Sequence, residues 1–315
     1  MRPFRFGYQY MASDPGELLV QARKAEASGF DVFHTFDHVG ATLSSLAPLV
    51  AVAGVTERLR VCPLVLNNDW RQPVVLAQEL ATIDLLTNGR LEVGIGAGHS
   101  FTEYQSVGQA FDAPSVRKSR LAESAVLIRR LLDGEVVTHD GDFFHLDEAS
   151  IIRPRQVHVP LLIGVNGREA LAHAAEHADI IGLTMFGQTL QDGQSHEVRW
   201  QADRLDFTIE WISVTAKGRS SELELNALVQ AVVITDDRKR AAGTIVDQVE
   251  GLTLDDALTT PFLAIGTPEE IVAHLQHCQE RWGISYFSVR DIDAFSAVIA
   301  VAKSAEQVTD PAKPQ

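Results

Sequence analysis

Short apolar runs alternate with longer segments of helical period along most of this chain of 315 residues. Eight runs have the length of a strand, at 4–10, 30–38, 59–67, 90–98, 160–165, 179–184, 228–235 and 285–291. Each is followed by a helical pattern, such as 73–88, which starts at a proline and ends at Asn-Gly. Alternating strands and helices predict a parallel sheet. Eight units at this length favour an α/β fold of the (β/α)8 TIM-barrel type, with a doubly wound open sheet as the alternative.

The second half of the chain is less regular and contains two segments that exceed simple connections. Residues 134–159 include the hairpin-like stretch THDGDFFHL, and residues 186–225 are long and mostly helical in pattern. We therefore expect a single barrel domain over 1–305 with insertions at about 134–159 and 186–225. Both insertions are expected to cover the barrel mouth. The polar end, 306–315, is expected to be a flexible tail.

Composition excludes several classes of function. The net charge of −15 argues against binding to nucleic acid or to an anionic membrane surface. No window holds the roughly 18 apolar residues of a membrane span, and the N-terminus lacks the apolar core of a signal peptide. Only two cysteines occur, Cys62 and Cys278, far apart in the sequence. These features together predict a cytoplasmic protein in a reducing compartment.

An ionisable pair, Asp37 and His38, stands where the second strand ends. In a barrel of this type the chemistry lies at the carboxyl ends of the strands. An imidazole there can donate or accept a proton, and Asp37 could orient it. The alternative is a hydrogen-bonded pair with a purely structural role.

The third and fourth strands also end in unusual sequences. Pro63 removes a ladder donor, so a bulge is expected near it, before the turn-forming segment 67–69. Glycines alternate at 94, 96 and 98, which would let a planar ligand or a phosphate approach the backbone. The pattern does not match the dinucleotide fingerprint, because position 99 is histidine and no helix starts promptly. Glu103 could contact a ligand or could simply begin a helix.

The fifth strand is followed by Val165, Asn166 and Gly167 at the start of a helix. Backbone N–H groups at such a turn, with the helix dipole behind them, form a ready anion site, although the turn could equally be a generic connection. His173 and His177 in HAAEH fit a zinc-helix pattern. They fall well past the expected mouth and lack a third ligand, so no metal site is predicted.

Taken together, these stretches resemble the luciferase-like monooxygenase superfamily. The resemblance is strongest over 30–130 and 158–184, through NNDWRQPVVLAQELATIDLLTNGRLEVGIGAGHSFTEY and VPLLIGVNGREALAHAAEHADIIG, and includes the C-terminal GTPEEIVAHLQHCQERWGISYFSV. It implies a (β/α)8 barrel with insertions that binds reduced FMN or the deazaflavin coenzyme F420 at its mouth. The NDWRQP and GAGHSFTEY segments look closer to the deazaflavin-dependent branch.

The resemblance also implies roles for individual residues. His38 and Glu103 would be catalytic, with His38 exchanging the proton that accompanies hydride transfer. The remaining contacts would hold the cofactor: Asp37 and His38 beside the ring; Leu64 and Val65 in a bulge that often contains a cis peptide; Gly96, Ala97 and Gly98 on strand four; and Val165, Asn166 and Gly167 around the phosphate. Two positions depart from the family pattern, Leu64 and His99, and both bear on ring contacts and substrate size.

The function that follows is hydride transfer between F420 and a small organic substrate. An FMNH2-dependent monooxygenase is one alternative, and a non-catalytic deazaflavin- or ligand-binding barrel is another. Trp70, Phe101 and Tyr104 are expected to line the mouth, which would favour an apolar or aromatic substrate. Homodimers are common in the family, so a homodimer is compatible with the resemblance.

Overall fold

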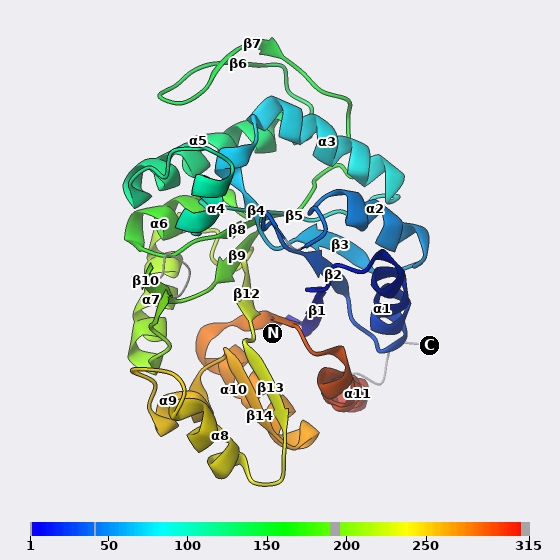
Figure 1. Ribbon diagram of the computed structural model, residues 1–315, viewed down its shortest axis with the longest axis vertical. Coiled ribbons are helices and arrows are strands. Elements are labelled where there is room, and N and C mark those ends of the chain that lie inside the picture. The colour runs from blue at the N-terminus through cyan, green and yellow to red at the C-terminus, as the bar shows by residue number, and fades with distance from the viewer. Residues whose placement is uncertain (1, 41, 190–195, 310–315) are drawn as a thin grey trace.

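A ring of parallel strands lies at the centre of the computed structural model, which describes residues 2–40, 42–189 and 196–309 (Figure 1). The strands follow the order β3-β2-β1-β15-β12-β9-β8-β5-β4. Their bounds are β1 (Arg5–Gln9), β2 (Val32–Thr35), β3 (Arg60–Pro63), β4 (Leu66–Asn67), β5 (Val93–Gly96), β8 (Leu161–Gly164), β9 (Ile180–Leu183), β12 (Glu224–Leu228) and β15 (Ile284–Val289). Because β3 and β4 are two halves of one segment, and Val61 bridges to Leu91 beside β5, the ring has eight positions and the predicted barrel is confirmed.

Helices surround this ring, one after each strand position (Figure 1). They are α1 (Pro15–Ala27), α2 (Ala47–Gly54), α3 (Pro73–Leu86), α5 (Pro114–Leu132), α6 (Arg168–His177), α7 (Ala202–Thr215), α10 (Pro268–Trp282) and α11 (Ile292–Thr309). Proline starts many of them because its missing N–H is not needed in the first turn. α10 also has a capping box between Thr267 and Glu270, and it ends at Gly283 in the left-handed conformation.

The seventh strand differs from the sequence prediction. The ring strand is β12, whereas the predicted run 228–235 falls largely on β13 (Ala231–Ile234). That strand pairs outside the ring with β14 (Leu263–Gly266), which the sequence did not reveal, and α8 (Arg238–Val246) and α9 (Leu254–Thr259) lie between them. β12 was missed because it carries polar Glu224 and Asn226, both buried in the barrel, so its apolar signal is weak.

The first insertion lies away from the mouth, contrary to prediction. Its hairpin of β6 (Val137–Asp140) and β7 (His145–Ala149) joins α5 to β8 and covers the outside of α3 and α5 (Figure 1). Val137 and Phe144 pack there with Ala77, Leu127 and Leu131. A connection from a helix to the next strand starts from the N-terminal end of the barrel, so this segment could not reach the cavity.

The second insertion does border the mouth. It contains β10 (Phe186–Thr189), β11 (His196–Val198) and helix α7, and its side chains at His196, Arg199 and Trp211 line the cavity described below. Residues 190–195 of this insertion lie outside the described residues. In the predicted tail, α11 continues to Thr309, so 306–309 belong to a helix, and 310–315 lie outside the described residues.

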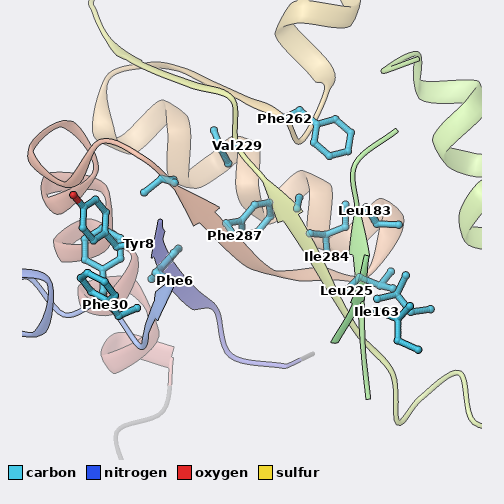
Figure 2. Packing of buried hydrophobic residues seen from close by; sticks show 14 of the residues in the cluster. Phe6, Tyr8, Phe30, Ile163, Leu183, Leu225, Val229, Phe262, Ile284 and Phe287 are labelled. Atoms are coloured by element: carbon cyan, nitrogen blue, oxygen red, sulfur yellow. The ribbon is translucent and has the colours of Figure 1, made fainter. Parts of the chain in front are cut away.

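The apolar core fills the space between the ring and the helices. Figure 2 shows Phe6 of β1 and Phe287 of β15 in this layer, with Phe30 and Tyr8 beside helix α11. The Phe6 ring meets that of Phe295 on α11 edge to face, with centroids 5.6 Å apart. Such burial is the main driving force for folding. No helix within the described part of the chain has the length and apolar character needed to cross a bilayer.

The inside of the ring is arranged in layers, in which charged and polar groups lie beside an apolar cluster of Val32, Cys62, Leu162, Ile180 and Tyr286. The lowest, which we call the floor layer, consists of Arg5, Arg60, Glu92 and Glu224. Arg5 pairs with Glu92 and, at 2.5 Å, with Glu224, while Arg60 Nε donates to Glu92 at 2.7 Å. Burial lowers the pKa of Arg5, but the neighbouring carboxylates outweigh it and the net pKa is raised. The floor layer is therefore a charge-neutralised network.

Above the floor layer lies His34, fully buried in β2. Its Nδ1 lies 3.3 Å from the Cys62 carbonyl oxygen, and its Nε2 lies 3.0 Å from the hydroxyls of Tyr286 and Ser288. Burial lowers the pKa of His34 to about 4, so the ring is neutral, with Nδ1–H as donor and Nε2 as acceptor.

Candidate active site

A cavity of about 1340 Å³ opens at the carboxyl ends of the ring strands. It is larger than the roughly 300–1,000 Å³ of a typical small-molecule pocket. Every residue predicted from the sequence to be catalytic or to bind the cofactor lines it: Asp37, His38, Leu64, Val65, Gly96, Ala97, Gly98, Glu103, Val165, Asn166 and Gly167. The structure thus brings these separate strand ends together at one cavity, as the barrel topology requires.

His38 and Glu103 form a direct pair at the cavity. His38 follows β2, and Glu103 is in the first turn of α4 (Phe101–Ser106). His38 Nδ1 lies 2.6 Å from Glu103 Oε1, and the backbone N–H of Val39 donates to Oε2 at 3.3 Å. A carboxylate accepting from Nδ1–H fixes the tautomer, so Nε2 is the nitrogen that can exchange a proton with a ligand.

Asp37 is held more tightly than the sequence suggested. Its carboxylate accepts from Arg71 at 2.6 and 2.9 Å, from the Asn67 backbone N–H at 2.8 Å and from the Ser45 hydroxyl at 2.5 Å. These bonds join the end of β2 to the chain after β4. The carboxylate is thus occupied within the protein, and its clear effect is to position His38 and Asn67. Arg71 was not singled out from the sequence.

Two of the alternating glycines, Gly94 and Gly96, make room for the bulge between β3 and β4. The peptide bond between Leu64 and Val65 is cis. A Cβ on Gly94 would lie 2.0 Å from the Pro63 carbonyl oxygen, and one on Gly96 would lie 2.6 Å from Val65 Cγ2. Gly94 and Gly96 therefore make room for the bulge, whereas Gly96 and Gly98 also line the cavity, so close approach of a ligand to this backbone stays a prediction. The bulge in turn presents Leu64 and Val65 to the cavity.

None of the three aromatic residues expected at the mouth lines the cavity. Tyr104 is fully buried, and its hydroxyl lies 3.1 Å from Asn67 Oδ1 and 3.0 Å from Asp69 Oδ2. Neither Trp70 nor Phe101 borders the cavity; Trp70 packs near Tyr104, and Phe101 meets Phe111. The prediction was wrong for Tyr104 and Phe101 because α4 buries Tyr104 and places Phe101 against Phe111, and for Trp70 because its ring packs near Tyr104. The aromatic side chains that do line the cavity are Phe36, Phe111, Phe207 and Trp211.

A cation from α5, Lys118, lies beside the turn after β8, and the sequence did not single it out. Gly167 has a positive φ of 85° and caps the N-terminus of α6. Lys118 Nζ, from α5, lies 3.1 Å from where a Cβ on Gly167 would be. Burial, and next the neighbouring Arg117, lower the pKa of Lys118. A helix N-terminus with an ammonium group beside it is suited to an anion such as a phosphate. The basic cluster at 117–120 was the only signal in the sequence.

A second histidine, His99, stands next to His38. Their ring centroids are 5.4 Å apart, and His99 lies 5.1 Å from His196 of the second insertion. Burial, followed by the two neighbouring histidines, lowers the pKa of His99 to about 4. At neutral pH it therefore forms a neutral aromatic wall beside the His38–Glu103 pair.

The two histidines of the zinc-helix pattern on α6 lie side by side, and among the described residues they belong to no group of three potential metal ligands. The rings of His173 and His177 are 4.4 Å apart. Within residues 2–40, 42–189 and 196–309, no group of three or more His, Cys, Asp or Glu side chains is placed to hold a metal ion.

Comparisons with known proteins agree with this geometry. The family model described as luciferase-like monooxygenase matches residues 2–286. An F420-dependent glucose-6-phosphate dehydrogenase from Beutenbergia cavernae is 31% identical over 276 residues, which cover 81% of each chain. One from Nakamurella multipartita is 36% identical over 187 residues, but this match spans only 56% of this chain and 55% of that relative. The F420-dependent tetrahydromethanopterin reductase of Methanopyrus kandleri has a similar fold, with a TM-score of 0.75 at 18% identity over 96% of this chain and 98% of that one.

Proposed function

Because the chain belongs to the luciferase-like monooxygenase family, we propose that it is an F420-dependent oxidoreductase acting on a small organic substrate. Relatives that match most of this chain are named for F420-dependent activity, which favours F420 over FMN. The observation that carries the proposal is the cavity itself. It combines a histidine–carboxylate pair near one side with a cationic helix N-terminus after β8.

The residues present fit a cofactor with a flat ring and a phosphate-bearing tail. Leu64 and Val65 offer an apolar surface on the bulge, where a ring system could rest. Lys118 and the backbone at 165–167 would hold the phosphate, because the ammonium and the helix dipole both favour negative charge. β4 and β8 occupy the third and fifth positions of the ring, so one molecule could span both regions.

F420, when bound, supplies or accepts a hydride at C5 of its deazaflavin ring. His38 handles the accompanying proton at Nε2, taking it from an alcohol in the oxidative direction or giving it to a carbonyl in the reverse one. Glu103 holds Nδ1–H and stabilises the imidazolium after proton uptake. The α7 region, through Phe207 and Trp211, borders the mouth and reduces access of water.

The test is an acceptor and donor screen with purified protein and F420, run in parallel under argon and in air. We expect conversion between oxidised and reduced F420 that proceeds equally without oxygen. Turnover that requires FMNH2 and stops under argon would instead identify a monooxygenase. Tight F420 binding with no transfer to any compound of a broad panel would favour a non-catalytic binder.

A further inference from the structure

Arg290 enters the cavity without a carboxylate partner. It follows β15 at the eighth ring position and lines the cavity. None of the ion pairs between described residues involves its guanidinium, although the chain as a whole carries an excess of acidic side chains. Arg290 is an exposed residue at the mouth, yet the protein around its guanidinium lowers its pKa by partial burial, and no neighbouring acid offsets this. An arginine remains charged under these conditions.

Two neutral side-chain amides accept hydrogen bonds from this guanidinium and fix its orientation. Arg290 Nε donates to Gln9 Oε1 at 2.9 Å, and Nη1 donates to Gln230 Oε1 at 2.9 Å. Each amide is itself oriented, because Gln9 Nε2 donates to the Leu64 carbonyl at 2.9 Å and Gln230 Nε2 donates to the Leu228 carbonyl at 3.0 Å. The oxygens therefore face Arg290, which is fixed in place while its charge is not neutralised.

The guanidinium keeps donors for a ligand. No hydrogen bond between described residues uses Nη2, and Nη1 has a second N–H. These two nitrogens form the edge that binds a carboxylate through two parallel hydrogen bonds. Through Gln9 the arginine is also connected to Leu64, so this edge is held at a fixed place relative to the bulge.

We propose that Arg290 is a specificity residue that binds the carboxylate of an acidic substrate. This rests on the proposed function, since it assigns the substrate end of the same cavity. Lys118 and the turn at 165–167 follow the fourth and fifth ring positions, so Arg290 lies across the mouth from the expected phosphate of the cofactor. One unneutralised arginine between two amides matches a monoanionic carboxylate better than a dianionic phosphate.

This assignment separates the chain from relatives named for glucose 6-phosphate. A phosphate monoester would call for further cations beside Arg290; Arg168 and Arg204 line the same cavity, but the Gln9 and Gln230 amides hold Arg290 alone. The other arginine used for comparison, Arg199, lines the cavity but is already paired with Glu197 at 2.7 Å. It therefore provides a matched control, an arginine of the same cavity whose charge is neutralised.

The experiment measures binding of benzoate and hexanoate, each against its carboxamide, to the protein saturated with F420, using the cofactor's fluorescence. Phenyl phosphate is included as a dianionic probe. We expect each acid to bind about tenfold or more tightly than its amide. Arg290→Gln should remove this preference, and so should Gln230→Glu, which places a carboxylate on the guanidinium. Arg199→Gln should retain it, and F420 affinity should stay within about threefold in all variants.

Several results would overturn the proposal. They are equal binding of acid and amide, tighter binding of phenyl phosphate than of benzoate, no binding of any acid, or loss of F420 affinity in Arg290→Gln with the acid preference intact. Calorimetric titration of benzoate into the cofactor-free protein distinguishes a failure of the Arg290 assignment from a failure of the proposed F420-dependent function. If F420 fails to bind but benzoate binding still depends on Arg290, only the assignment of the cofactor is wrong.

Discussion

The two ends of the barrel contain the same residue types in opposite situations. In the floor layer Arg5 is matched by Glu92 and Glu224, whereas at the mouth the hydrogen bonds of the Arg290 guanidinium to other described residues go to the neutral amides of Gln9 and Gln230. Histidine shows the same contrast within a few residues of β2. His34 uses both ring nitrogens inside the barrel, while His38 uses Nδ1 for Glu103 and keeps Nε2 for the cavity. Polar groups that hold the fold, Asp37 at the mouth included, are matched by the protein, whereas His38 and Arg290 retain capacity for a ligand.

The largest effect is expected at His38. His38→Ala should lower turnover about 10²- to 10⁴-fold, because a positioned acid–base group contributes about that much. Since the side chain is at the cavity rather than in the core, F420 affinity should change far less. Steady-state kinetics and fluorescence titration measure the two quantities. Comparable losses in both would make His38 a binding residue and weaken the contrast with His34.

A loss of stability is expected when the floor layer is broken. Arg5→Met leaves Glu92 and Glu224 short of a cation, and removing one partner of a buried pair costs about 3 kcal/mol or more. Arg290→Met removes no ion pair but takes the donors from Gln9 and Gln230, so it should lower the free energy of unfolding by less, about 1 kcal/mol. Urea unfolding compares the two variants. Equal destabilisation would mean that the mouth arginine is structural too.

Lys118 should affect the cofactor alone. Lys118→Met is expected to weaken F420 binding about tenfold or more, because it removes a charged donor from the turn at Gly167. The deazaflavin chromophore without its phosphate tail should bind both proteins equally. Lys217→Met is the control, since that lysine pairs with Glu176 on the exterior. A similar loss for the tail-free chromophore would place Lys118 at the ring instead of the phosphate.

A further effect concerns the pH dependence of the free energy of unfolding and His34. Its pKa is about 4 in the folded state against 6.5 for an ordinary histidine, so the unfolded chain binds more protons between these values. Stability should therefore fall as pH drops from 6.5 toward 4, by about 1.4 kcal/mol per pH unit for this group. His34→Gln should have a shallower dependence when unfolding is followed at pH 7.5 and 5. If the free energy of unfolding of His34→Gln depended on pH as steeply as that of the wild type, the protonation of His34 would not be linked to folding.

The sequence predicted those parts of the molecule that depend on local periodicity. Seven of the eight ring positions follow from apolar runs, because their side chains face helices on one side and a filled barrel on the other. β12 escaped because Glu224 and Asn226 point into polar interior layers. The hairpin 137–149 was recognised as an insertion. Its place outside α3 and α5 was missed because a connection from a helix to the next strand lies at the N-terminal end of the barrel, opposite the mouth.

The candidate site was predictable where function coincides with a strand end. His38 and the turn at 165–167 follow strands directly, and the family resemblance linked Glu103 to them. Lys118 and Arg290 gave no comparable signal, because what distinguishes them is their neighbours in three dimensions, Gly167 for Lys118 and the amides of Gln9 and Gln230 for Arg290. The alternating glycines were noticed, yet their contact with Pro63 and Val65 becomes visible only once β3, β4 and β5 are side by side.

The most direct test of the central claim is a fluorescence titration of the wild-type protein with F420 and, separately, with FMN. The mouth described here predicts saturable binding of F420 at one site per chain, at least about tenfold tighter than that of FMN, together with oxygen-independent hydride transfer to a substrate. Preference for FMN, or failure to bind either cofactor, would contradict the account.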